Sequence, residues 1–146
     1  RIMSLKDGTK KMSKSELSDF SRINLTDDKD LIINKIKKAK TDPLPIPSDI
    51  EELKRRPEAK NLLGIYSSLT DVSIEKSIQI FANKNFSEFK NELSQVLVEK
   101  IEPISVEIKK LINDKKYLEK VLFDGRQKAN DIASIKVKKL QEIVGF

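Results

Sequence analysis

Apolar residues recur every three or four positions along most of the second half of the chain. This spacing places them on one side of an α-helix and does not match the two-residue alternation of a half-buried strand. The pattern runs, with interruptions, from Pro57 to Val144. We therefore expect residues 57–146 to form an α-helical bundle with its aromatic side chains in the core.

Capping residues predict where these helices begin. Pro57 suits a first helical position, and Ser73 and Ser87 are typical N-caps of the next two helices. Although Pro103 removes one backbone hydrogen bond, the apolar spacing continues beyond it. We therefore expect one kinked helix across the proline and not two separate helices.

The end of the chain is expected to hold two more helices. Asp114 marks a turn, and a short helix follows it. A last helix is expected from about Gly125 to Val144, with Gly145 as its C-cap. Its inward residues would be Ala129, Ile132, Ala133, Val137, Leu140 and Val144.

The N-terminal residues are less regular. The apolar run from Arg1 to Leu5 is typical of the end of a strand, and it leads into a polar loop over residues 6–26, with Gly8 as a hinge. This segment holds no second apolar run, so we predict that the strand lacks a partner. The chain thus resembles the C-terminal piece of a larger protein, and the unpaired segment would fray or pair with another copy.

A helix and a stiff connector come next. Thr26 or Asp27 is expected to cap a helix that runs to about Lys40, with Ile32, Ile36 and Ala39 on its apolar face. Alternating prolines at positions 43, 45 and 47 then favour an extended connector. A proline-rich ligand for another protein is the alternative reading. Ser48 and Glu51 match a capping box for a short helix over 49–55.

Composition excludes several classes of protein. The chain has no cysteine and no histidine, so disulfide scaffolds, thiolate sites, a cysteine nucleophile and histidine ligands are absent. No apolar run is long enough to span a membrane. Residues 1–40 hold 11 of the basic and 6 of the acidic residues. This excess favours a polyanion such as ATP or RNA, although a solvated lysine-rich surface would explain it as well.

One pentapeptide carries the chemistry. Residues 11–15 are Lys11, Met12, Ser13, Lys14 and Ser15. Two ammonium groups three residues apart can both face a triphosphate and balance the charge that develops as pyrophosphate leaves. The serine hydroxyls add hydrogen-bond donors, and the methionine can anchor the loop on an apolar surface.

The pentapeptide is the KMSKS signature of the class I aminoacyl-tRNA synthetases. The stretch from Arg1 to Ser15 resembles the bacterial tryptophanyl members in particular. Further resemblances lie at residues 38–42, 61–66, 89–90, 103–104, 125–129 and 143–146.

The resemblance implies a fold and an activity. The fold would be an all-α helical domain that contacts tRNA, preceded by the strand end and signature loop of a Rossmann-like catalytic domain that lies outside this chain. Residues 1–26 would close the nucleotide-binding domain, 27–56 would connect, and 57–146 would form the anticodon-binding domain. The complete enzyme would activate L-tryptophan with ATP and Mg²⁺ and transfer it to tRNA(Trp).

The resemblance also implies roles for single residues. Lys11 and Lys14 would be catalytic and would bind the ATP phosphates, while Met12, Ser13 and Ser15 would shape the ATP-binding loop. Ile2 matches a position that contacts adenine. The full-length enzyme would be a cytoplasmic homodimer with no membrane attachment and no metal ligands in this part of the chain.

Two departures from the family pattern matter. The chain lacks the histidine-containing HIGH-like signature, so we expect this part alone to be inactive. Glu16 and Leu17 replace the Asp-Pro that follows the pentapeptide in many relatives, which affects only the local loop. Two alternatives stay open, namely a stand-alone helical tRNA-binding module without catalysis and a helical interaction domain with solvated lysines.

Overall fold

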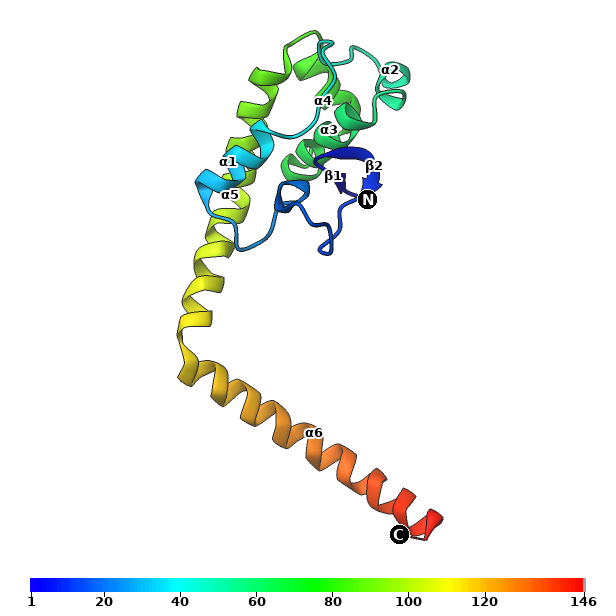
Figure 1. Cartoon of the computed structure of the whole chain (residues 1–146), viewed down its shortest axis with the longest axis vertical. Coiled ribbons are helices and arrows are strands. Elements are labelled where there is room, and N and C mark those ends of the chain that lie inside the picture. The colour runs from blue at the N-terminus through cyan, green and yellow to red at the C-terminus, as the bar shows by residue number, and fades with distance from the viewer. Residues whose placement is uncertain (146) are drawn as a thin grey trace. The chain divides into compact units, whose positions relative to one another are not determined.

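A computed structural model describes residues 1–145 (Figure 1), so the resemblance at Phe146 lies outside the described residues. The chain is mostly helical with one small antiparallel sheet, which confirms the predicted helical character. The elements are β1 (Met3–Ser4), β2 (Asp7–Lys11), a 3-10 helix η1 (Asp19–Ser21), α1 (Lys29–Lys37), α2 (Ile50–Lys54), α3 (Pro57–Thr70), α4 (Ile74–Phe81), α5 (Phe86–Asn113) and α6 (Lys115–Val144).

The chain divides into two compact units. The first covers Arg1–Val106, and the second begins at Glu107. The N-terminal hairpin therefore packs in the same unit as the helices from α1 to α4. The proposed functional division at residues 26 and 56 stays a prediction. Within residues 1–145, no helix is both long enough and apolar enough to cross a membrane.

The first apolar run does have a strand partner. β1 pairs antiparallel with β2, with an irregularity between Met3 and Ser4. Our prediction of a loop that begins at residue 6 is therefore wrong for Asp7–Lys11. Little in the sequence DGTKK indicates a strand, because aspartate, glycine and lysine are depleted in sheets. The strand forms because its backbone finds a partner and a helix to pack against.

The hairpin packs closely on α3. Gly8 is buried, and a Cβ atom added to it would lie 2.5 Å from the carbonyl carbon of Pro57. Asn61 accepts a hydrogen bond from the Met3 N–H at 2.8 Å and donates one to the Met3 carbonyl at 2.9 Å. Gly8 is thus a close-approach glycine, and the predicted hinge is wrong.

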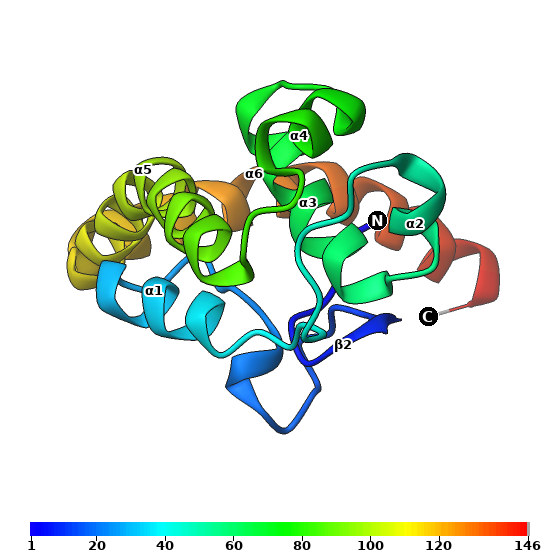
Figure 2. The same cartoon turned by 90° about the horizontal axis from the view of Figure 1, so that it is seen from above.

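The core of the first unit lies among α1, α3, α4 and α5. Tyr66, Phe81 and Phe89 pack edge to face, with ring centroids 4.8 to 6.1 Å apart. Figure 2 shows α1 beside α5. The Lys90 ammonium of α5 donates to the carbonyl of Ala39, which lies just after α1, at 2.6 Å. The predicted inward residues Ile32, Ile36 and Ala39 are all buried. However, α1 ends at Lys37 and not near Lys40, so Ala39 follows the helix. The buried apolar residues are Leu5, Ile32, Ile36, Ala39, Ile46, Leu53, Ala59, Leu62, Leu63, Ile65, Ile78, Phe81, Phe86, Phe89, Leu93 and Leu97.

The cap of α1 differs from our prediction. Asp28, and neither Thr26 nor Asp27, is the N-cap, and its side chain accepts a hydrogen bond from the Leu31 N–H. Asp27 is buried and pairs instead with Lys35. Adjacent acidic residues can all act as caps, so only the tertiary partner decides which one does.

Two further caps also shift by one or two residues. Asp49, and not Ser48, caps α2. Asn85, and not Ser87, accepts the hydrogen bond from the Glu88 N–H at the start of α5. The predicted starts of α3 at Pro57 and of α4 after Ser73 are confirmed.

The proline-rich connector is part of the first unit. Ile46 and Pro47 are buried, and Ile46 exchanges backbone hydrogen bonds with Asn83 and Lys84. The connector forms neither helix nor strand and bends at Pro43 and Leu44, and these contacts attach it to the turn that precedes α5. It is therefore not a spacer between separate bodies.

The C-terminal residues correct a larger part of the prediction. α5 does continue through Pro103 as one helix. However, α6 is a single helix that passes through Gly125 without a break, and none of its residues is buried. The predicted core positions of this helix, such as Ile132 and Leu140, are 71% and 61% exposed. Its aromatic residues Tyr117 and Phe123, which we also expected in the core, are 50% and 59% exposed. Periodicity identifies the apolar side of a helix, but another element must exist to cover that side.

The end of α6 agrees with the sequence. Gly145 adopts a left-handed φ of +83°, and its N–H donates to the Gln141 carbonyl. The predicted glycine cap is confirmed.

Candidate nucleotide-binding loop

The signature pentapeptide begins where β2 ends. Lys11 is the last strand residue, and the Met12 N–H donates to the Ile2 carbonyl at 3.2 Å. The Met12 side chain is partly buried against the core, whereas Lys11 and Lys14 are exposed. The structure thus confirms that Met12 attaches the loop to an apolar surface and leaves both ammonium groups in solvent.

The two serines form a local turn around Lys14. Their hydroxyl oxygens lie 3.0 Å apart, and the Ser15 N–H donates to the Ser13 hydroxyl at 3.3 Å. Short side-chain to backbone bonds of this kind hold a tight turn without regular secondary structure. The residue at the tip of the turn is therefore a lysine.

The charges of the loop are not neutralised within the described part of the chain. In residues 1–145, neither Lys11 nor Lys14 makes an ion pair, whereas the neighbouring Lys10 lies 3.5 Å from an Asp7 carboxylate oxygen. Both ammonium groups are therefore available to an anion from outside this part of the chain.

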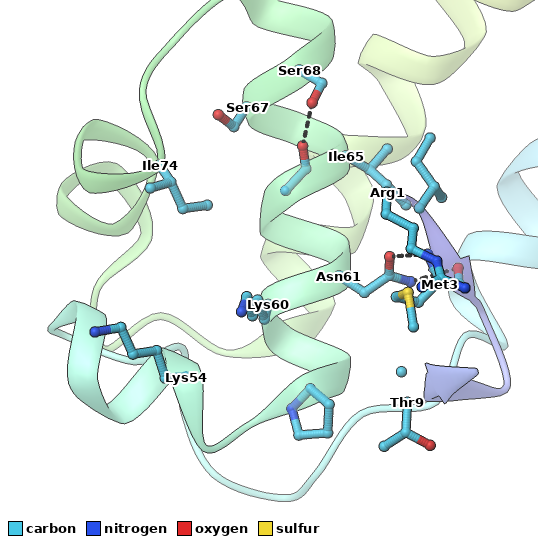
Figure 3. A pocket seen from close by; sticks show the side chains of 14 residues that line it. Arg1, Met3, Thr9, Lys54, Lys60, Asn61, Ile65, Ser67, Ser68 and Ile74 are labelled. Atoms are coloured by element: carbon cyan, nitrogen blue, oxygen red, sulfur yellow. Dashed lines mark hydrogen bonds between the residues drawn. The ribbon is translucent and has the colours of Figure 1, made fainter. Parts of the chain in front are cut away.

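Ile2 lies next to the loop and lines a cavity. The cavity has a volume of about 700 Å³ and opens between the hairpin and α3 (Figure 3). Lys54 and Lys60 add positive charge to it, and Thr9 and Asn61 add polar groups. The backbone brings Ile2 together with Met12, but the residues from Lys11 to Ser15 do not line this cavity.

Sequence reasoning missed the residues that hold the chain after the loop. Lys35 has no exposed surface, and its ammonium lies 2.6 Å from a carboxylate oxygen of Asp19 and 2.6 Å from one of Asp27. The hydrogen bond from Lys35 lowers the pKa of Asp19 below its ordinary value. The sequence did contain one signal for this ion pair. Lys35 lies between Ile32 and Ile36 on the apolar side of the helix, where a lysine needs an acidic partner.

Metal ligands were not expected in this part of the chain. Within residues 1–145, no group of three aspartate or glutamate side chains is placed to hold a metal ion.

Comparisons with known proteins match most or all of the chain. The family model described as tRNA synthetases class I (W and Y) matches residues 1–130. The chain is 48% identical over 146 residues to a tryptophan–tRNA ligase of Mesorhizobium japonicum and 52% identical to one of Rickettsia felis. These matches cover 100% of this chain and 41% and 44% of the relatives.

A solved structure agrees with the sequence comparisons. The crystal structure of tryptophanyl-tRNA synthetase from Mycoplasma pneumoniae superposes with a TM-score of 0.70 at 26% identity. The match covers 100% of this chain and 44% of that one. The chain therefore spans less than half the length of these proteins.

Proposed function

The chain belongs to the tRNA synthetases class I (W and Y), and from this premise we propose that it is the C-terminal part of a tryptophan–tRNA ligase. Relatives about half identical over its full length carry that name. The observation that carries the proposal is the exposed signature loop at the end of β2, with two lysines that no acidic side chain of residues 1–145 neutralises.

The proposed reaction has two steps. The carboxylate of L-tryptophan attacks the α-phosphate of ATP and forms an adenylate, and pyrophosphate leaves. The terminal ribose of tRNA(Trp) then takes the aminoacyl group and releases AMP. Mg²⁺ would arrive with the ATP phosphates as part of that substrate.

Lys11 and Lys14 would act in the first step. Negative charge grows on the bridging oxygen and on the departing pyrophosphate as the bond to the α-phosphate breaks. An ammonium group that contacts this charge more strongly in the transition state than in bound ATP increases the rate. The exposed lysines would contact the phosphates through movement of the loop, which suits groups that act only during the reaction.

The other loop residues would support these lysines. Met12 would attach the loop to the core, and Ser13 and Ser15 would hold the turn around Lys14. Ile2 would contact the adenine from the strand end. Each role rests on the backbone and side-chain contacts described above together with the family resemblance.

The remaining parts of the proposal concern the whole protein. The helices of residues 57–146 would contact the anticodon, and residues 1–26 would complete the nucleotide-binding domain. The full-length enzyme would be a cytoplasmic homodimer. The chain by itself would be inactive, because its tryptophan pocket would come from residues outside it.

Tryptophan-dependent exchange between ATP and pyrophosphate tests the proposal. In the full-length protein, Lys14→Ala should slow adenylate formation about 100-fold, as expected for the loss of one transition-state donor. Lys76→Ala removes an exposed lysine of α4 and serves as the matched control, with an unchanged rate.

Three results would count against the proposal. An unchanged rate in Lys14→Ala would remove that lysine from its role. Robust exchange by the 146-residue chain alone would refute the need for residues outside it. A full-length protein that binds tRNA in a salt-dependent manner but performs no exchange would favour the RNA-binding module instead.

A further inference from the structure

Arg22 contacts the chain directly after the signature loop. The Arg22 guanidinium donates through Nη1 to the backbone carbonyl of Glu16 at 2.9 Å. Glu16 is the residue immediately after Ser15, the last residue of the signature. Its carbonyl is thus the first point after the loop that receives a side-chain hydrogen bond from elsewhere.

The guanidinium is itself held in place. Arg22 Nη2 lies 3.0 Å from Asp19 Oδ1, and Nε donates to Asn24 Oδ1 at 3.2 Å. The planar guanidinium group presents its donors in a fixed arrangement. Three acceptors around one such group leave it little freedom to rotate, so the position of Glu16 is coupled to that of Asp19 and Asn24.

Asp19 and Asn24 are in turn bonded to the buried pair of Lys35 and Asp27. Lys35, without exposed surface in α1, binds the other oxygen of Asp19 and also Asp27, which is 4% exposed. Asn24 donates to both of these carboxylates, at 3.0 and 3.2 Å. A continuous series of hydrogen bonds therefore leads from the core of α1 to the backbone at the end of the loop.

The other side of the loop is fixed by the hairpin. The Leu5 N–H donates to the Ser21 carbonyl at 2.8 Å, which joins η1 to the hairpin. The Met12 N–H bonds to Ile2 on the incoming side. The residues between Met12 and Glu16 therefore lie between two points that are held by the rest of the first unit.

We propose that Arg22 is a positioning residue for the signature loop, which it fixes through the Glu16 carbonyl on a support built by Lys35. This inference rests on the proposed function. Loss of the contact would release the outgoing end of the loop, and the added conformational freedom must then be removed when the lysines engage ATP. Because the proposed tryptophan pocket comes from residues outside this chain, tryptophan should bind as before.

The kinetic test uses the full-length protein and tryptophan-dependent pyrophosphate exchange. Arg22→Ala should reduce kcat/KM for ATP about tenfold, with an unchanged KM for tryptophan and an unchanged fraction of active molecules in an active-site titration. Arg22→Lys keeps the charge beside Asp19 but has a single nitrogen, so it should recover only part of the loss. Arg55→Ala, at an exposed arginine next to α2, is the control and should match the wild type.

A second measurement does not need activity. Hydrogen–deuterium exchange of the amides of residues 13–18 should be faster in Arg22→Ala and unchanged in Arg55→Ala. If the wild type shows no pyrophosphate exchange, the proposed function fails. The amide measurement would still test whether Arg22 holds the Glu16 carbonyl.

Four outcomes would overturn the inference. These are an unchanged kcat/KM for ATP, unchanged amide exchange in the loop, full recovery in Arg22→Lys, and a loss of active molecules with a normal rate per active site. The last would show that Arg22 serves only the fold.

Discussion

A methyl group at position 8 should separate the hairpin from α3. In Gly8→Ala the new Cβ would lie 2.5 Å from the Pro57 carbonyl carbon and 2.6 Å from the Glu58 nitrogen. Both atoms belong to the backbone at the start of a helix, so no side chain can rotate away. A shift of about 0.9 Å is needed to restore an ordinary contact of 3.4 Å to that carbonyl carbon.

The shift should lower the free energy of unfolding. Extra atoms in a well-packed interior destabilise proteins by about 1–3 kcal/mol. The Asn61 bonds to Met3 resist the movement, since a departing hairpin would leave those groups unpaired. We expect a loss of about 2 kcal/mol, which corresponds to a decrease in Tm of about 4–8 °C for a chain of this size.

The assay is thermal unfolding of the 146-residue chain, followed by near-ultraviolet circular dichroism. This signal reports the packing of the aromatic rings at Tyr66, Phe81 and Phe89. Gly64→Ala is the matched control, because a Cβ at that position in α3 meets nothing within 4 Å. Alanine is favoured over glycine inside a helix by about 1 kcal/mol, so this variant should melt higher.

Gly8→Ala should lower the Tm and Gly64→Ala should raise it, and these opposite changes test the close contact between the hairpin and α3. If Gly8→Ala melts at the wild-type temperature while Gly64→Ala is stabilised, the close approach of the hairpin to α3 is wrong. If both variants lose stability equally, glycine is needed for a reason other than contact with Pro57.

Two further predictions concern stability. Phe89→Ala removes a fully buried ring from the aromatic cluster, so it should lower the free energy of unfolding, measured by urea titration, by about 3–5 kcal/mol. A loss below about 1 kcal/mol would contradict this packing. Because the pKa of Asp19 is lowered in the folded chain, its ionised form stabilises the fold above pH 3.8, and this contribution is lost as the pH falls through the lowered pKa. The Tm should therefore depend less on pH below about 4 in Asp19→Asn than in the wild type or in Asp124→Asn, and parallel curves would refute the role of Lys35 as its partner.

Much of the first unit could be predicted from local patterns. Pro57 and Ser73 start helices where the sequence indicates, and the apolar positions of α1 face the core. These features depend on backbone chemistry within one or two turns, which the amino-acid sequence contains directly.

Other features depend on partners far away in the sequence. β2 has weak strand propensity and exists because of β1 and α3. The loop is held by the contacts of Arg22 with Glu16 and of Lys35 with Asp19, and no residue spacing in the sequence indicates these contacts. Among Asp27 and Asp28, the choice of cap depended on which carboxylate the buried lysine engaged.

The amino-acid sequence alone determined the family resemblance, the helical character and the lysine pair of the signature loop, because these are properties of residue type and short spacing. Only the tertiary structure decided how the loop is held and which apolar faces are covered. Ile132 and Ile32 both lie in predicted helix faces, yet the first is 71% exposed and the second is fully buried. Burial is a relation between two surfaces, and a pattern within one helix describes only one of them.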